Sequence, residues 1–288
     1  MTTVPRLTRR LFATAVAGLA AGCSPLAMLD ALGPRDRGAR RVAQDLAYGP
    51  HARQRYDLYA PRDGADWPVV VFFHGGGWDS GAKDLYGWVG QAFAAQGFLV
   101  AVPSYRLVPE FVFPAFVDDA AGATAVVQAV AGRYGGNPAR LAVAGHSAGA
   151  HLAMMIMLDP DYLARVGAAG IIRAAVGLSG PYEFLPLDVP ASINAFGQWP
   201  RLDETQPIHY ARGDAGPILL VHGERDVTVH AEDSVHLAEA IRRAGGTAEL
   251  KLYPTLDHAG VLAPFSPLFR DRAPVLSDCA NFLHRTLG

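Results

Sequence analysis

Short apolar segments alternate with longer segments of helical periodicity along most of the chain. Apolar runs rich in β-branched and aromatic residues predict strands, and most of them end at glycine or proline. Between them, apolar residues recur at the spacing of one helix face. The predicted strands cover residues 55–59, 68–73, 98–102, 141–144, 174–178, 218–221 and 248–253, and the predicted helices 85–96, 116–134, 148–158, 231–244 and 273–287. This alternation predicts an α/β fold with a mostly parallel central sheet and helices on both faces.

Two segments do not follow the alternation. Residues 24–40 are expected to form a tether, so that the folded domain covers residues 41–288. Residues 181–215 are rich in Pro, Asp and Asn and carry no clear periodicity. A long segment of this kind inside a compact domain is usually a lid or a pocket wall, which is the role expected here.

Composition excludes several classes of protein. The chain has 288 residues, of which 50% are hydrophobic and 18% charged, so a disordered or collagen-like chain is excluded. The net charge is −2, and no basic tract beyond the extreme N-terminus could neutralise a run of phosphates, so we expect no nucleic-acid partner. No His, Cys and Asp cluster has metal-ligand spacing, so neither a metal nor an organic cofactor is expected. Cys279, in the last predicted helix, is interpreted as a small buried hydrophobe.

The N-terminus is typical of an export signal peptide. Residues 1–23 contain three arginines followed by an uncharged apolar stretch that is too short for an ordinary membrane anchor. Residues 8–12 (Thr-Arg-Arg-Leu-Phe) resemble the twin-arginine signal, and residues 19–23 resemble a lipoprotein box in which Cys23 is acylated. Ala20 departs from that box, so the alternative is an ordinary Ala-x-Ala site beside Cys23. We expect a protein of the periplasm or cell envelope, attached to the membrane if Cys23 is lipidated.

The strongest chemical signal lies between a predicted strand and a predicted helix. Residues 145–149 read Gly-His-Ser-Ala-Gly, a G-x-S-x-G turn in the strand–helix context that gives this motif its meaning. The serine of such a turn has a strained backbone that exposes its hydroxyl, and only very small side chains fit two residues before and after it. Ser147 is therefore the predicted nucleophile.

A serine hydroxyl needs a general base, and the base needs a carboxylate to orient it. Asp226 follows the predicted strand 218–221, and His258 follows the next strand, giving the order Ser, Asp, His. Glu224 is the rival acid, and Asp257 is interpreted as a loop or capping residue. Other histidines have no such position and are expected on the surface or in the core: His51, His209, His230, His236 and His284.

A glycine run supplies a third element. Residues 74–78 read His-Gly-Gly-Gly-Trp directly after the strand 68–73. Such a run can turn backbone N–H groups toward one point, where they would stabilise a developing oxyanion. The alternative, a phosphate-binding loop, lacks both a following lysine and the G-x-G-x-x-G spacing.

Together these elements resemble an α/β-hydrolase of the hormone-sensitive-lipase-like carboxylesterase group. The chain also resembles a sequence block of that group at residues 105–110 (Tyr-Arg-Leu-Val-Pro-Glu), residues 113–115 (Phe-Pro-Ala) and Asp118. The whole resemblance spans residues 50–287. The resemblance implies a catalytic set of Ser147, Asp226 and His258 with the backbone N–H groups of Gly76, Gly77 and Ala148 as oxyanion donors.

The resemblance has two informative departures. Many members of that group carry Asp where this chain has His146, and residues 145–152 are closer to BD-FAE-type esterases and to kynurenine formamidase. His151, in the same stretch, is expected to pack or hydrogen-bond at the base of the nucleophile helix. The N-terminal cap is short, which leaves the acyl pocket to residues 181–215 and to aromatics such as Trp78, expected to bind substrate.

These features predict an exported serine esterase that cleaves small-molecule carboxylic esters of short to medium acyl chain. One alternative is an arylformamidase using the same triad on an N-formyl group, although an export signal argues against it. The other is a non-catalytic small-molecule-binding protein on a hydrolase scaffold, against which the intact Ser147, Asp226 and His258 argue.

Overall fold

The structure is a computed structural model, and it describes residues 33–288. The predicted export signal, Cys23 and most of the predicted tether lie outside the described residues.

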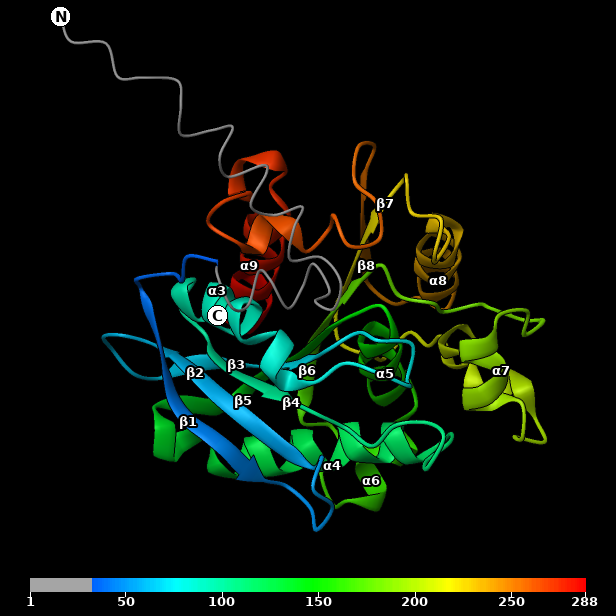
Figure 1. Cartoon of the computed structure of the whole chain (residues 1–288), viewed down its shortest axis with the longest axis horizontal. Coiled ribbons are helices and arrows are strands. Elements are labelled where there is room, and N and C mark those ends of the chain that lie inside the picture. The colour runs from blue at the N-terminus through cyan, green and yellow to red at the C-terminus, as the bar shows by residue number, and fades with distance from the viewer. Residues whose placement is uncertain (1–32) are drawn as a thin grey trace, which may run out of the picture.

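The strands of the described chain form a single eight-stranded sheet in the order β1-β2-β4-β3-β5-β6-β7-β8 (Figure 1). β1 and β2 run antiparallel to their neighbours, and the pairs from β4 onward are parallel. The central strands are continuously apolar because helices cover both faces of the sheet. The bounds are β1 Ala39–Ala47, β2 Arg55–Pro61, β3 Trp67–Phe73, β4 Leu99–Pro103, β5 Gly136–His146, β6 Ile172–Leu178, β7 Ile218–Gly223 and β8 Ala248–Tyr253.

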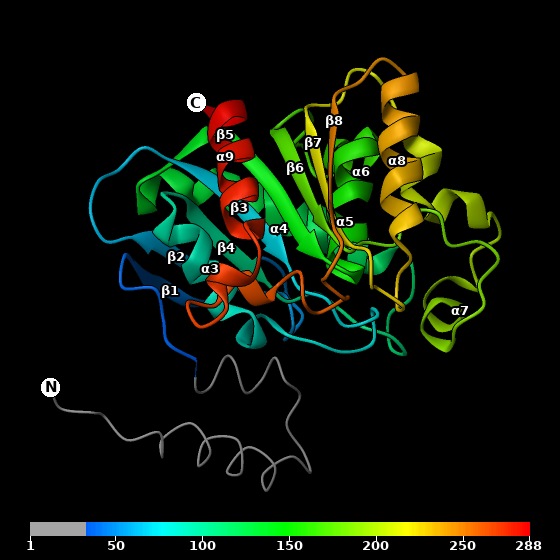
Figure 2. The same cartoon turned by 90° about the horizontal axis from the view of Figure 1, so that it is seen from above.

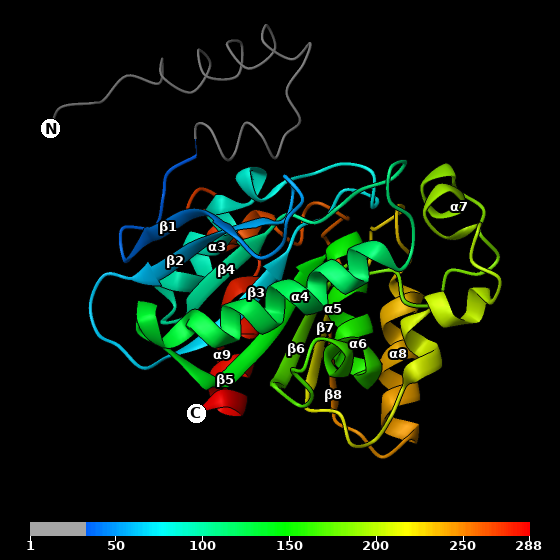
Figure 3. The same ribbon diagram turned by 90° about the horizontal axis from the view of Figure 1, so that it is seen from below.

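Helices pack on both faces of this sheet. α3 (Gly87–Ala95) and α9 (Val275–Leu287) share one hydrophobic core with it, and lie in front of the sheet in Figure 2. The opposite core includes α4 (Ala115–Val130), α5 (Ala148–Leu158), α6 (Pro160–Arg165) and α8 (Ala231–Arg243) (Figure 3). Cys279 is fully buried in the α9 core, as expected. The predicted α/β class is confirmed, and the architecture is that of an α/β-hydrolase.

Sequence patterns missed elements at the edges of the fold. β1 begins at Ala39, so the last two residues of the predicted tether belong to the sheet, and the domain starts before residue 41. β1 is an edge strand with mostly exposed or half-exposed residues, and it therefore lacks the apolar run used for the other strands. β5 begins at Gly136, five residues earlier than the pattern indicates, because its first five residues (Gly-Asn-Pro-Ala-Arg) are mostly exposed or half-buried and form no apolar run.

The segment 181–215 is not structureless. It contains α7 (Pro190–Phe196) and two single-turn 3-10 helices at Leu202–Thr205 and Pro207–Tyr210. Figure 1 shows α7 beside the sheet rather than on either face. The backbone N–H of Phe113 donates to the carbonyl of Ala195 (2.9 Å), which ties α7 to the loop after β4. We call residues 181–215 the lid segment.

Candidate active site

Ser147 occupies the sharp turn between β5 and α5. Its backbone has φ 56° and ψ −124°, a conformation that a non-glycine residue rarely adopts. A Cβ on Gly145 would lie 2.2 Å from the carbonyl oxygen of Gly149, and a Cβ on Gly149 would lie 2.2 Å from that of Phe73. Both glycines are therefore required by close backbone contacts, and they allow the turn that exposes the Ser147 hydroxyl.

Three predicted residues come together at this turn. Nε2 of His258 lies 2.9 Å from Oγ of Ser147, and Nδ1 of His258 lies 2.7 Å from Oδ2 of Asp226. The serine follows β5, the aspartate follows β7 and the histidine follows β8. The three side chains therefore meet at the edge of the sheet where these parallel strands end. The side chain of His258 is 19% exposed, which leaves its ring accessible from solvent.

Asp226 is held as a buried carboxylate. Its Oδ1 accepts hydrogen bonds from the backbone N–H groups of Thr228 and Val229, both at 2.9 Å. Burial raises the pKa of Asp226, but hydrogen bonds from His222, His258 and Val229 outweigh it and hold this pKa far below its usual range. Asp226 is therefore ionised at every pH at which the protein would work. The rival acid Glu224 is exposed to solvent.

His222 is a residue of the site that the sequence analysis did not single out. Its Nε2 lies 3.0 Å from the carbonyl oxygen of Val229 and 3.2 Å from Oδ2 of Asp226, so this nitrogen carries the proton. Its Nδ1 then accepts from the hydroxyl of Ser234 on α8, at 2.7 Å. Asp226 thus receives histidine N–H groups from two sides. The available signal was the position of His222 at the carboxyl end of β7, four residues before the acid.

The glycine loop after β3 adjoins the nucleophile, because Phe73 pairs with Gly145 across β3 and β5. Gly76 and Gly77 have φ of 128° and 56°, and a Cβ on Gly76 would lie 2.3 Å from the carbonyl oxygen of Ser80. Ala148 is the first residue of α5, where N–H groups have no acceptor within the helix. Backbone donors of the loop and of the helix therefore flank Ser147.

A buried network fixes this loop from behind. The hydroxyl of Tyr105 donates to the carbonyl of His74 (2.9 Å), and the two rings are stacked 4.2 Å apart. Arg53 donates from Nε to the carbonyl of Tyr105 and from Nη2 to that of Gly81, each at 2.7 Å. Burial lowers the pKa of His74 to about 3, so its ring is neutral. The loop conformation is thus set by side chains that do not reach the reaction centre.

Of the two adjacent acids after residues 105–115, Asp119 is the buried one and Asp118 is not. The carboxylate of Asp119 is buried and accepts two hydrogen bonds from Arg106, one from Nη2 at 2.7 Å and one from the backbone N–H at 2.8 Å. It accepts a third from the side-chain amide of Gln54 at 2.7 Å. Asp118 is partly exposed and pairs with Arg165 at 3.2 Å. Asp119 lies on the buried face of α4, whereas Asp118 does not.

Trp78 and His151 lie under the lid segment. Trp78 is only 5% exposed, and its ring meets those of Phe196 and His151 edge-on, with centroids 4.7 and 5.4 Å away. Nε2 of His151 donates to the carbonyl of Thr205 (2.9 Å), and burial lowers the pKa of His151 to about 4. The interpretation of His151 as a hydrogen-bonding residue of the nucleophile helix agrees with this contact. Trp78 directly follows the glycine loop, and its contact with substrate stays a prediction.

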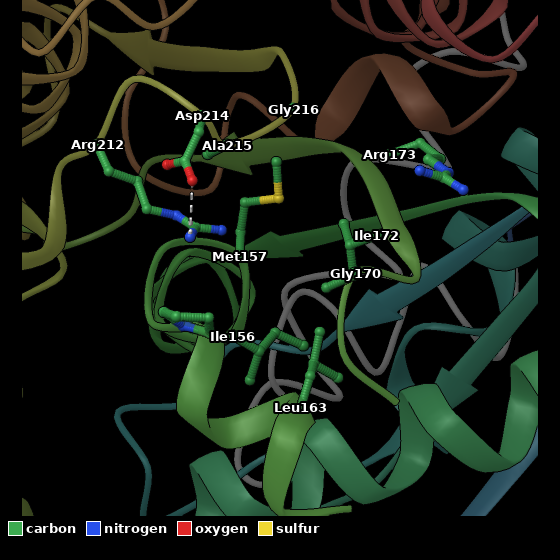
Figure 4. A pocket seen from close by; sticks show the side chains of 11 residues that line it. Ile156, Met157, Leu163, Gly170, Ile172, Arg173, Arg212, Asp214, Ala215 and Gly216 are labelled. Atoms are coloured by element: carbon green, nitrogen blue, oxygen red, sulfur yellow. Dashed lines mark ion pairs between the residues drawn. The ribbon is translucent and has the colours of Figure 1, made fainter. Parts of the chain in front are cut away.

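A cavity of about 310 Å³ lies elsewhere, between the ends of α5 and α6 and the segments that lead into β6 and β7 (Figure 4). Met157, Leu163 and Ile172 supply apolar side chains to it. Arg212 and Asp214 face each other across 3.6 Å at its rim. Because it lies at the amino ends of these strands, the cavity is separate from the site around Ser147.

Within residues 33–288, no helix is long and apolar enough to cross a membrane. The same part of the chain contains no group of three or more His, Cys, Asp or Glu side chains that could hold a metal ion.

Comparison with known proteins identifies the family. The BD-FAE family model matches residues 56–241. The chain belongs to the BD-FAE family. The resemblance to BD-FAE-type esterases is thereby confirmed.

Curated relatives and solved structures of this chain carry esterase names. It is 35% identical over 219 residues to the carboxylesterase NlhH of Mycobacterium tuberculosis, covering 67% of this chain and 66% of that protein. It is 30% identical over 270 residues to a probable isoprenylcysteine alpha-carbonyl methylesterase of Oryza sativa, covering 85% and 64%. The butyrate-bound structure of Thermogutta terrifontis esterase 2 is 26% identical and matches with a TM-score of 0.70 over 86% of this chain and 94% of that one. The chain spans just under two thirds of the length of these curated relatives.

Proposed function

We propose that this BD-FAE protein is a serine esterase that hydrolyses small carboxylic esters through an acyl-enzyme. The observation that carries the proposal is the continuous set of contacts from Ser147 Oγ to His258 Nε2 (2.9 Å) and from His258 Nδ1 to buried Asp226 (2.7 Å). The esterase names of its relatives support the same class of reaction.

In the proposed reaction, Ser147 attacks the ester carbonyl while His258 takes its proton. Asp226 orients the imidazole and stabilises the imidazolium that forms. The N–H groups of Gly76, Gly77 and Ala148 stabilise the tetrahedral oxyanion, a contribution of roughly 10²–10³ in rate for each donor. His258 then protonates the leaving alcohol, and a water activated by the same ring hydrolyses the acyl-enzyme, restoring Ser147.

We propose further that the acyl group is short to medium in length. The space beside Gly77 is limited by Trp78 and by α7, whose Ala191 methyl lies 3.5 Å from where a Cβ of Gly77 would be. Each buried methylene adds about 0.8 kcal/mol, so specificity constants should rise only to about four to six carbons and then fall. The butyrate bound to Thermogutta terrifontis esterase 2 is an acyl group of this size.

Two measurements test the proposal. A fluorophosphonate probe should label the wild-type protein at Ser147 and leave Ser147→Ala unlabelled, whereas a non-catalytic binding protein would resist the probe in both forms. A series of nitrophenyl esters from about two to sixteen carbons then defines the acyl pocket. Specificity constants that keep rising beyond about ten carbons would contradict the short acyl pocket and make the protein a lipase.

We also propose export to the periplasm or cell envelope, which rests on residues 1–23 alone. A reporter fused to residues 1–30 should be exported, and an Arg9→Lys, Arg10→Lys double variant should retain it in the cytoplasm. Unchanged export of that variant would indicate the general secretory route instead. Lipid attachment is tested by labelling with radioactive palmitate, which the wild-type protein should incorporate and the Cys23→Ser variant should not.

A further inference from the structure

His146 is the last residue of β5 and stands directly before Ser147, yet the proposed reaction gives it no role. Its side chain is almost fully buried. The ring centroids of His146 and His258 are 4.9 Å apart, so the two histidines are neighbours although 112 residues separate them in the chain.

One hydrogen bond links the two residues. Nε2 of His146 lies 2.9 Å from the backbone carbonyl oxygen of His258. A carbonyl oxygen only accepts, so Nε2 of His146 carries the proton and donates it. Nδ1 is the unprotonated nitrogen, and it is buried with no hydrogen-bond partner in the part of the chain that the structure describes.

The surroundings of His146 fix its ring and keep it neutral. A Cβ on Gly75 would lie 2.9 Å from Nδ1 of His146 and 3.0 Å from the hydroxyl of Tyr86, so the ring fits only because residue 75 is glycine. Burial, then repulsion from a charged His258, lowers the pKa of His146 to about 3. A neutral donor at this position does not oppose the positive charge that His258 carries during the reaction.

The loop that His146 contacts is held from two sides. Residues on both sides of His258, Asp257 and Ala259, are exposed. On one side, the backbone N–H of Arg225, in the turn that carries Asp226, donates to the carbonyl of Leu256 (3.0 Å). Within the loop, the backbone N–H of Gly260 donates to Oδ1 of Asp257 (2.7 Å). The bond from His146 instead reaches the loop from the strand that carries the nucleophile, and therefore fixes the base relative to Ser147.

We propose that His146 is a positioning residue that holds the backbone of His258 against the nucleophile strand through its Nε2–H donor. The inference rests on the proposed serine esterase function and deepens it. If the bond is lost, the loop can shift and the contact of 2.9 Å between Nε2 of His258 and Ser147 Oγ lengthens. A displacement of about 1 Å at a reacting group can cost on the order of 10²-fold in rate.

The test compares three variants of the full chain. Gln places an amide nitrogen near the position of Nε2 and keeps the donor. Asn carries the same amide one methylene shorter and cannot reach the carbonyl, and Phe fills the space without a donor. We expect kcat for nitrophenyl butyrate to fall about 10- to 100-fold in His146→Asn and His146→Phe with KM within about threefold, and kcat to stay within about threefold of wild type in His146→Gln.

Two controls keep the outcomes distinct. Fluorophosphonate labelling of the wild type reports on the proposed function, because an unlabelled wild type would contradict the esterase itself. With the wild type labelled, an Asn variant as active as wild type, or a Gln variant as impaired as Asn, would overturn the positioning role. Thermal melting of each variant is measured in parallel, and if His146→Phe does not fold, the Gln and Asn variants decide the question alone.

Discussion

The two halves of the site are held in different ways. We name the two halves after their proposed roles. The oxyanion half consists of residues 74–81 and their supports, and the acid–base half consists of the loops that carry Asp226 and His258. In the first, His74 and Tyr105 are fully or almost fully buried and stack on each other. In the second, Asp226 is buried, but the next residue, Val227, is 86% exposed.

This difference matches what each half would have to do. Backbone N–H donors act only if the backbone itself is fixed, so glycines with positive φ and a buried network behind them are needed. A general base must reach substrate, leaving group and water, so its loop stays near solvent. The orientation of His258 then depends on two side chains. Asp226 accepts a hydrogen bond from its ring, and His146 donates one to its backbone carbonyl.

The largest effect should come from the acid of the acid–base half. Asp226→Asn should lower kcat about 10⁴-fold, because an amide no longer holds the tautomer of His258 that accepts the serine proton. Circular dichroism and melting temperature should show that the variant remains folded. Steady-state kinetics with nitrophenyl butyrate measures the loss.

Glu224→Gln is the matched control, since Glu224 is exposed and only two residues away. Its kcat should stay within about twofold of wild type, as expected for a surface substitution remote from the reaction. Equal losses in the two variants would show that Glu224 shares the role of the acid.

For the oxyanion half we expect a loss of stability instead. Asp119 accepts hydrogen bonds from Arg106 and Gln54, which are the chain neighbours of the two loop supports Tyr105 and Arg53. Asp119→Ala removes the carboxylate that accepts hydrogen bonds from Nη2 and from the backbone N–H of Arg106. Breaking a buried pair costs about 3–5 kcal/mol, and because Arg106 is 23% exposed we expect about 3 kcal/mol. Urea unfolding measures the change.

Asp118→Ala provides the comparison for that loss. Asp118 and its partner Arg165 are 45% and 56% exposed, so removing this pair should cost about 1 kcal/mol or less. A larger loss in Asp118→Ala than in Asp119→Ala would contradict the assignment of Asp119 as the buried partner of Arg106.

The same division explains which residues could be predicted from sequence. Ser147, Gly145 and Gly149 belong to one turn whose steric demands are local, so five consecutive residues identify it. Asp226 and His258 follow from the order of strands, because the carboxyl ends of parallel strands share an edge. His146 and His222 could not be assigned a role, since their contacts depend on packing between loops that no local pattern describes. The buried partner of Arg106, Asp119, could not be told from Asp118 either, because the sequence does not fix which of two adjacent helix positions faces inward.

The last effect we predict is pH-dependent and concerns the histidines behind the site. Burial lowers the pKa of His74 and His146 to about 3, and that of His151 to about 4. In the unfolded chain these rings take up a proton below about pH 6.5, whereas in the folded protein they stay neutral. The unfolded state therefore binds more protons, and the free energy of unfolding must fall as the pH drops from about 6.5 toward 4. At pH 5 each ring accounts for about 2 kcal/mol.

Replacing one of these rings by a side chain that does not titrate tests the sign and the size of this effect. His151→Gln can keep a donor near the carbonyl of Thr205, to which Nε2 of His151 donates at 2.9 Å. Urea unfolding of this variant and of wild type at several pH values between about 7 and 5 should give curves that converge as the pH falls, because one proton-binding site is missing from the unfolded state of the variant. Parallel curves for His151→Gln and wild type would mean that His151 takes up its proton in the folded protein as readily as in the unfolded chain, and that the packing of the lid segment on α5 is looser than its contacts indicate.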